Sequence, residues 1–361
     1  MPRLTTWSLR HPRLVVLLAS ALVAWCAVAA TRLPTAIGVE SALGPHHARI
    51  QEFHAFIERY GAGHSILLAW GCGRVDACDG VLDEASLRAV ARVGRALEPS
   101  PGVIRVESPV TTPLLVADPG VGFSRRWLFD TGEPASDRAS LAKLALADRG
   151  WVGRLVSADG RTGVMVVETA SSETASMQAA TRAVARAVDD QRARGFEAHA
   201  IGQPVVEDAL AVGAARDGSL LSAAVALILS LVIQGLTRTW VAVVSVVASV
   251  GVGAASCFGW MSLLGMPRDP ISAAAPMLVM VIGSATGLHL FCAALAARAV
   301  GGTREESLRT AARRQSLPCL LATATTAGAL SSYCVGDVAA LVRLGSIMTV
   351  GVGAAFLACF S

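Results

Sequence analysis

Hydrophobic segments are distributed unevenly along the 361-residue sequence. One apolar segment lies near the start, a long polar stretch follows, and five further apolar segments then stand almost back to back. A helix needs about 20 apolar residues to cross a hydrocarbon core about 30 Å thick. The pattern therefore predicts a membrane α-helical bundle with six spans, at 14–33, 218–236, 240–264, 271–296, 317–335 and 340–360.

The first predicted span admits two interpretations. It follows three arginines and ends in small residues, which is also the pattern of a secretory signal peptide. The length of its apolar run favours a retained anchor, with residues 1–13 as a cytoplasmic N-terminus. In both interpretations the polar stretch 34–217 is exported.

Arginines in the short connections predict the orientation of the bundle. Cytoplasmic loops of membrane proteins carry an excess of Lys and Arg, and alternating spans place every arginine-rich connection on one side. Residues 34–217 then form an extracytoplasmic domain, and 298–316 a cytoplasmic basic amphipathic helix. The net charge of +4 follows from these arginines and gives no sign of a nucleic-acid partner. The arginines on the predicted cytoplasmic side are Arg3, Arg10, Arg13, Arg238, Arg298, Arg304, Arg309, Arg313 and Arg314.

The polar stretch alternates between strand and helix patterns. Short apolar runs predict strands, and apolar residues at spacings of three and four predict amphipathic helices. A strand–helix–strand order followed by strand–strand–helix–strand fits an α+β ferredoxin-like domain, with helices on one face of an antiparallel sheet. The predicted strands are 64–70, 103–106, 152–157, 162–168 and 196–201, and the predicted helices are 43–60, 83–97, 139–147, 172–194 and 205–217.

Two groups of side chains in the exported stretch are candidates for special chemistry. Cys72 and Cys78 stand in a glycine-rich loop, and an oxidising compartment favours a disulfide between them. A two-thiol metal site is the alternative, but it lacks further ligands at a recognisable spacing. His46, His47 and His54 favour a solvated helix face over a metal site, because few carboxylates lie nearby. No metal site and no cofactor is predicted.

Polar side chains in the predicted spans are the main candidates for function. His289 is the ionisable side chain, cysteines apart, that lies well inside a span, and ionisable groups in a bilayer are functional candidates by default. We expect a polar seam between the fourth and fifth spans, for substrate or protons. Packing of helices through small and hydroxyl residues is the alternative. The seam consists of His289, Thr286, Ser284, Gly283, Gly287, Thr323, Thr325 and Thr326.

Several motifs, in order along the chain, resemble the resistance–nodulation–division superfamily. The resemblance is strongest to its mycobacterial-membrane-protein-large and Patched-like predicted exporter branch. It implies a sterol-sensing-type bundle in a bacterial cytoplasmic (inner) membrane, and export of lipids or other hydrophobic compounds driven by proton flow. The motifs are Ile201–Pro204, the glycine-rich turn Gly259–Asp269, Ile282–Leu290, the Thr-Thr-x-Gly stretch in Ala322–Leu330, and Leu344–Gly351.

The sequence also departs from this family in two ways. Proton-coupled members carry an acidic residue where this chain has Ala285 and Thr286, so His289 would have to replace it. Complete members have two such halves, which implies a homodimer or a second half-transporter as partner. A non-transporting membrane sensor or assembly partner, or a truncated gene product, remains an alternative. An enzyme is not predicted, because no nucleophile–base–orienter set is recognisable.

Overall fold

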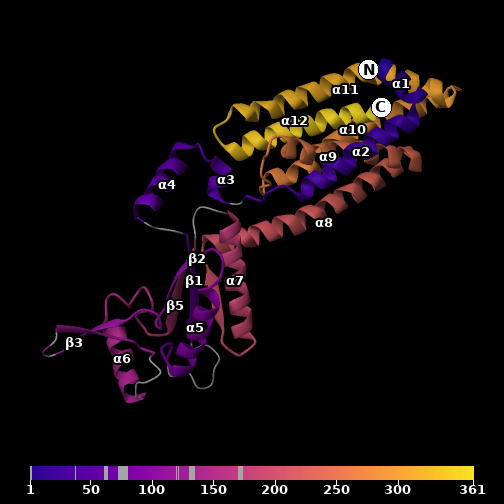
Figure 1. Cartoon of the computed structure of the whole chain (residues 1–361). Coiled ribbons are helices and arrows are strands. Elements are labelled where there is room, and N and C mark those ends of the chain that lie inside the picture. Colours follow the sequence, from indigo (N-terminus) through magenta and orange to yellow (C-terminus); the bar gives the residue numbers. More distant parts are fainter. Residues whose placement is uncertain are drawn as a thin grey trace. The chain divides into compact units, whose positions relative to one another are not determined.

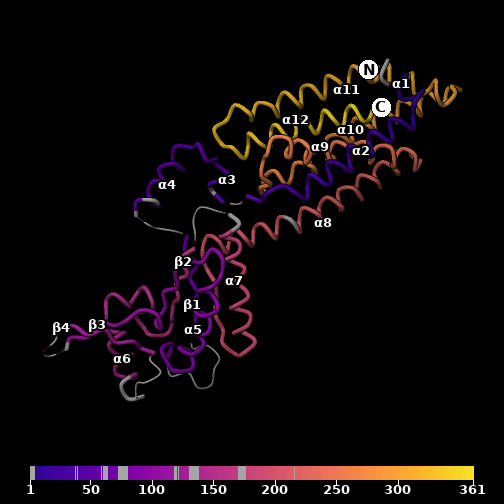
Figure 2. The backbone as a smooth tube through the Cα atoms, in the orientation of Figure 1, coloured from indigo at the N-terminus to yellow at the C-terminus, as the bar shows by residue number. Residues whose placement is uncertain are grey.

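The computed structural model describes residues 2–36, 38–60, 64–71, 80–118, 120, 122–129, 135–169 and 174–361. The chain divides into two compact units, and each is described by itself. The first combines Met1–Glu52 with Leu210–Ser361, and the second is Phe53–Ala209. In the first unit the indigo N-terminal helices lie beside the orange and yellow C-terminal ones (Figures 1 and 2).

The first unit is a bundle of long helices. Five helices are long and apolar enough to cross a membrane in the described part of the chain: α2, α8, α9, the helix of Ser272–Ala299 that contains α10, and α12. This confirms the multi-pass helical bundle, while the sixth span stays a prediction. The bounds are α1 Pro2–Arg10, α2 Pro12–Thr31, α3 Val39–Leu43, α4 Ala48–Tyr60, α8 Gln203–Thr237, α9 Trp240–Leu263, α10 Ala275–Ala299, α11 Arg304–Ser331 and α12 Ala339–Cys359.

Helix α11 joins two segments that the sequence divides. The predicted basic helix 298–316 and the predicted span 317–335 share one continuous helix, which contains Pro318. It begins at a capping box: the Glu306 amide donates to the Thr303 hydroxyl (3.3 Å), and the Glu306 carboxylate accepts from the Thr303 amide (3.1 Å). The bond from the Thr303 hydroxyl lowers the pKa of Glu306. The helix continues through Pro318 although proline lacks an amide hydrogen and disfavours a helix interior, so neither the proline nor the change from basic to apolar residues ends it.

Glycines allow the central helices to approach closely. A Cβ atom on Gly253 in α9 would lie 2.6 Å from the Ala355 Cβ of α12 and 2.8 Å from the Gly351 carbonyl oxygen. On Gly351 it would lie 2.7 Å from the Cys257 sulfur. Small residues at helix interfaces are the usual route to tight packing in membranes, where dispersion contacts replace the hydrophobic effect. The buried contact between α9 and α12 therefore depends on these two glycines.

The second unit is built on a four-stranded antiparallel sheet in the order β2-β5-β1-β6. The central strand β1 pairs antiparallel with both β5 and β6, and β5 pairs with β2. Helix α5 follows β1, and α7 follows β5; Asp83 caps α5 by accepting a hydrogen bond from the Ser86 amide (2.7 Å). The bounds are β1 His64–Gly71, α5 Glu84–Leu97, β2 Val103–Glu107, β3 Leu114–Asp118, β4 Gly122–Arg126, α6 Ala135–Ala147, β5 Thr162–Thr169, α7 Thr174–Arg192 and β6 Ala198–Ile201.

Two segments of this unit differ from the sequence prediction. The predicted strand 152–157 is a compact turn, and Val156 makes only isolated bridges to Val152 and Gly163. Its side chains explain this, because Trp151 and Leu155 are buried in the core and hold the segment in place without a regular ladder. The hairpin of β3 and β4 was not predicted. The predicted disulfide of Cys72 and Cys78 lies outside the described residues and stays a prediction.

The glycine contact between α9 and α12 can be tested by substitution. We expect Gly253→Leu to lower the thermal midpoint of the detergent-purified protein, because overpacking costs about 1–3 kcal/mol or more. Gly353→Leu is the matched control on α12, since a Cβ atom there meets no neighbour within 4 Å. Equal midpoints for the two variants would contradict the packing argument.

Candidate functional site

A cavity of about 510 Å³ lies between α10 and α11. Helix α12 contributes one apolar side chain to it. The cavity contains one imidazole, one amide and three threonine side chains among otherwise small or apolar residues. Its lining is Ile282, Gly283, Ala285, Thr286, His289, Gln315, Pro318, Cys319, Ala322, Thr323, Thr326 and Val352.

Helical periodicity explains why these side chains meet. On α10, Ile282, Thr286 and His289 follow spacings of four and three, which place them on one face of the helix. On α11 the cavity residues recur at the same spacings from Gln315 to Thr326. His289 is exposed and lies about 15 Å along the axis from the end of α10 at Ala299, at about 1.5 Å per residue. The imidazole is therefore near the middle of the helix rather than at its end.

The structure brings together most of the predicted polar seam. His289, Thr286, Gly283, Thr323 and Thr326 all line the cavity. This placement makes the seam a candidate site, and its role stays a proposal.

The other three predicted seam residues lie elsewhere. Ser284 donates to the Val281 carbonyl (2.7 Å), and Thr325 donates to carbonyls one turn back in α11. Gly287 lies against α9, where an added Cβ atom would stand 2.8 Å from Val246. Ser284 and Thr325 stand one or two positions away from cavity residues, so the helical rotation turns their side chains off the shared face.

Sequence reasoning missed Gln315 and Cys319. Gln315 precedes the predicted fifth span, and Cys319 lies within that span but was not assigned to the seam. Gln315, Cys319 and Thr323 follow one another at spacings of four, which continues the polar face of α11 towards its start. This spacing is the signal that identifies Gln315 and Cys319. Ala285 and Thr286, where an acidic residue was expected, line the same cavity.

The chemistry available in the cavity is hydrogen bonding and proton exchange at one imidazole. Its lining contains no carboxylate, and no group of three or more His, Cys, Asp or Glu that could hold a metal ion occurs among the described residues. Such a lining suits an amphiphilic molecule or water held by hydrogen bonds.

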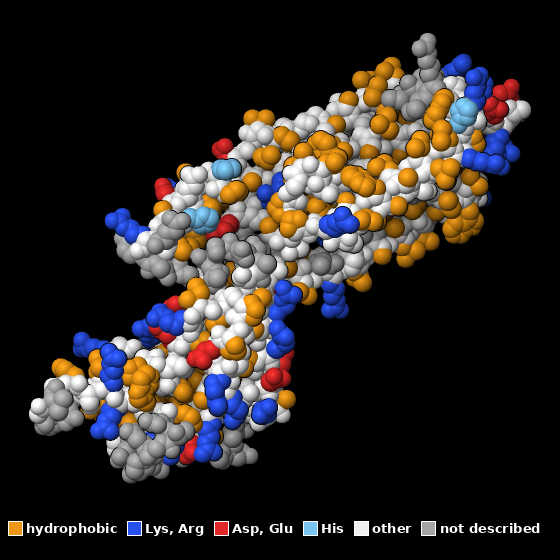
Figure 3. Space-filling view, in the orientation of Figure 1, with side chains coloured by type: hydrophobic (Ala, Val, Ile, Leu, Met, Phe, Trp, Pro, Cys, Tyr) orange, Lys and Arg blue, Asp and Glu red, His pale blue; other side chains and the backbone are white. Residues whose placement is uncertain are grey.

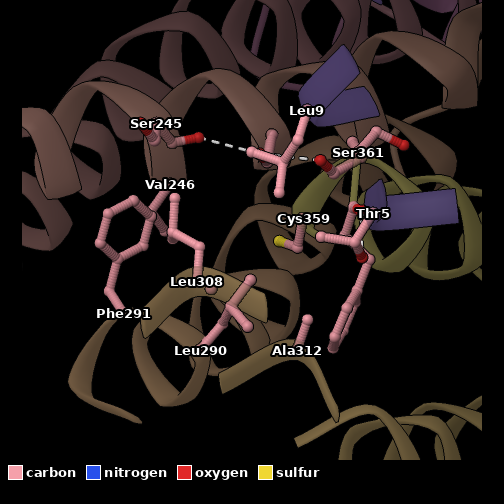
Figure 4. Close-up of a pocket in the computed structure, with 14 residues that line it drawn as sticks. Thr5, Leu9, Ser245, Val246, Leu290, Phe291, Leu308, Ala312, Cys359 and Ser361 are labelled. Atoms are coloured by element: carbon pink, nitrogen blue, oxygen red, sulfur yellow. Dashed lines mark hydrogen bonds between the residues drawn. The ribbon is translucent and has the colours of Figure 1, made fainter. Parts of the chain in front are cut away.

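A smaller cavity of about 190 Å³ lies where α1 meets the first half of α9, the middle of α10, the start of α11 and the end of α12. Figure 4 shows Thr5 and Leu9 of α1 beside Cys359 and Ser361, with Ser245 and Phe291 across from them. The Thr5 hydroxyl donates to the Phe360 carbonyl (3.0 Å) and so fixes α1 to the end of α12. The lining is mainly apolar, and we assign this cavity to packing. Lys and Arg gather at this end of the bundle on the face shown in Figure 3.

A buried ion pair ties three segments of the bundle together. The Asp269 carboxylate accepts from the Arg343 guanidinium of α12 (3.0 Å), and the side chains are only 4% and 12% exposed. The other Asp269 oxygen accepts from the amides of Ile271 and Ser272 (2.9 and 2.8 Å) at the turn into α10. Arg343 also donates to the Ser41 carbonyl of α3 (2.5 Å). The sequence did not predict this pair, whose members lie 74 positions apart.

Comparison with known proteins agrees with this architecture. A solved structure titled as a heavy metal efflux pump has a TM-score of 0.56 and 14% sequence identity, and covers 99% of this chain. The match covers 46% of the pump chain, so this chain spans about half of the pump's length. At this identity the likeness shows the fold alone. A search of curated protein sequences found no match.

Five of the described helices, each long and apolar enough to cross a membrane, define the class as a multi-pass membrane protein. Residues 88–361 match the MMPL family, and the chain belongs to that family. The family predicted from the sequence motifs is therefore confirmed.

The ion pair generates a testable prediction. We expect Arg343→Met to destabilise the purified protein by about 3–5 kcal/mol, because it leaves the Asp269 carboxylate buried without its partner. Adding Asp269→Asn should restore much of the loss, since asparagine can still accept the backbone hydrogen bonds without a charge. Thermal unfolding in detergent measures both, with Arg313→Met at an exposed position as the control. A double variant no more stable than Arg343→Met would contradict this explanation.

Proposed function

We propose that this chain is one repeat of a two-repeat exporter for lipids or other hydrophobic compounds. The observation that carries the proposal is the polar cavity between α10 and α11, with the exposed imidazole of His289 near mid-helix. A polar group on the outside of a membrane bundle is costly unless another protein surface or water covers it. Transporters built from repeats place their sites at the repeat interface, and the 46% coverage of the efflux pump fits one repeat.

The proposed topology has six spans and an extracytoplasmic domain at 34–217 in the bacterial inner membrane. Helix α11 supplies the fifth span with its apolar second half. The order β2-β5-β1-β6, with α5 after β1 and α7 after β5, supports a ferredoxin-like domain, because that fold joins two βαβ-type halves into one antiparallel sheet. The arginines near the start of α1 and between α10 and α11 support a cytoplasmic side at that end.

His289 is the proposed proton-exchanging group. Its imidazole lines the cavity and can both accept and donate a proton, whereas Ala285 offers no carboxylate for the task. The lack of a carboxylate also favours a second candidate function, a membrane sensor or assembly partner that keeps the bundle without proton-driven transport. The two functions differ in whether flux follows the proton gradient.

Flux in proteoliposomes separates these functions. We expect export of a fluorescent lipid to depend on an imposed proton gradient, and His289→Ala to reduce the gradient-dependent rate by about tenfold or more, as loss of an acid–base group does. Thr325→Ala is the control, because Thr325 bonds within α11 away from the cavity. Flux that ignores the gradient in wild type and variant alike would refute the pump and favour the sensor.

The two-repeat proposal also predicts the mass of the purified protein. We expect a homodimer in a mild detergent, because a second copy can cover the polar faces of α10 and α11. Light scattering with a correction for bound detergent measures this mass. His289→Leu removes a polar group from the proposed contact, so this variant should not form more dimer than wild type. A strictly monomeric protein would exclude the homodimer and leave a second half-transporter as the partner.

A further inference from the structure

Arginines gather on the outer side of the helices in the sheet-containing unit, Phe53–Ala209. Helices α5 and α7 each bury one side in the core of this unit, through residues such as Leu87 and Val184. On the face shown in Figure 3, Lys and Arg side chains gather over the part of the unit where Figure 1 places these helices. The two helices carry six arginines and three carboxylates: Arg88, Arg92, Arg95, Arg182, Arg186 and Arg192, with Glu84, Asp189 and Asp190.

The two helices lie side by side and run antiparallel. The Arg92 guanidinium donates from Nε to the Gln191 side-chain oxygen (3.1 Å), which joins the second half of α5 to the end of α7. Gly102 follows α5, and its backbone lies so close to the Ser176 carbonyl near the start of α7 that a Cβ atom would not fit. The residues after Arg92 in α5 therefore lie opposite the earlier turns of α7.

Three arginines of this region are held by uncharged acceptors. Arg95 donates from Nε to the Ala91 carbonyl (3.2 Å), one turn back in α5. On α7, Arg182 donates in the same way to the Gln178 carbonyl (3.1 Å), and Arg186 to the Arg182 carbonyl (3.2 Å). A carbonyl orients a guanidinium without cancelling its charge, and the Nη groups remain able to donate to a further acceptor.

Carboxylates compensate other arginines of these helices instead. Glu84 pairs with Arg88, and Asp189 pairs with Arg192 (3.3 Å). Within the described part of the chain, no ion pair involves the three arginines held by carbonyls. Like charges on neighbouring helical turns repel one another. An anionic surface that covers these arginines would relieve this repulsion.

The outer side of α5 and α7 suits an acidic protein better than a lipid or a nucleic acid. Helices that bind the membrane surface bury large apolar side chains there, and single-stranded nucleic acids stack on aromatic side chains. Among the described side chains of α5 and α7, no large hydrophobic residue is exposed. Arg182 and Arg186 lie about 6 Å apart along the axis, at about 1.5 Å per residue, which is also the spacing of carboxylates four positions apart on a second helix.

We propose that the outer side of α5 and α7 binds an acidic α-helix of a partner protein. Carboxylates of the partner helix, at spacings of four, accept hydrogen bonds from the Nη groups of Arg95, Arg182 and Arg186. Charge-assisted pairs of this kind favour defined geometry as well as opposite charge. This surface lies within the sheet-containing unit, and binding to it does not require transport.

Peptides of equal charge and different pattern test the proposal. The full-length protein in phosphatidylcholine nanodiscs is titrated into fluorescent alanine-rich helical peptides, and binding is measured by fluorescence anisotropy. One peptide carries glutamates at spacings of four on one face, the second has the same glutamates distributed around the helix, and the third has glutamine in their place. We expect the first peptide to bind most tightly, and added salt to weaken this binding because exposed charges are screened.

Variants of the protein locate the binding surface. The test variant replaces three arginines by glutamine and should weaken binding of the first peptide about tenfold, as loss of several exposed ion pairs does; it combines Arg95→Gln, Arg182→Gln and Arg186→Gln. The matched control makes the same change of charge at exposed positions elsewhere in the unit and should bind as wild type does; it combines Arg125→Gln, Arg149→Gln and Arg161→Gln.

Reversal of charge keeps the test independent of folding. Glutamate at the three test positions should create binding of a peptide with lysines in place of its glutamates, a gain that a misfolded protein would not show. Equal binding of the patterned and distributed glutamate peptides, or equal weakening in the test and control variants, would overturn the proposal. So would a test variant that loses binding to phosphatidylglycerol vesicles while its peptide binding stays unchanged, because the surface would then bind lipid.

Discussion

The high cost of an unpartnered polar group in hydrocarbon is the constraint on which this structure depends. Backbone groups avoid that cost by forming long helices, which is why the first unit contains little else. Asp269 and Arg343 avoid it by pairing at the turn into α10 and by recruiting Ser41. The cavity between α10 and α11 is the exception, because its polar side chains lie on a surface of the bundle. That exception is the reason to place function there.

Close packing and the polar cavity occupy adjoining faces of α10, and Gly283 borders both. Gly283 and Gly287 allow Val250 and Val246 of α9 to approach, as helix packing in membranes requires. The face that carries His289 and Thr286 turns instead towards α11. The packing interpretation therefore applies to Gly283 and Gly287, while a functional role of the cavity residues stays a proposal.

Membership of the MMPL family gives the class of the protein, and the residues modify what the class implies. Ala285 stands where an acidic group was expected, so any proton coupling has to use another side chain of the same cavity. The sheet-containing unit has a cavity of its own, formed by the start of α5, one side of α6 and the turn before β5.

The sequence by itself determined five long apolar helices, the start of α5 at Asp83 and the capping box of Thr303, because each depends on neighbours within a few residues. It also determined the family, through motifs spread along the chain. Only the tertiary structure decided which hydroxyls share the cavity with His289 and that Asp269 meets Arg343, 74 positions away. It also decided that residues 152–157 form a turn. These features depend on the rotation of one helix against another and on distant core contacts, which local hydrophobic periodicity does not encode.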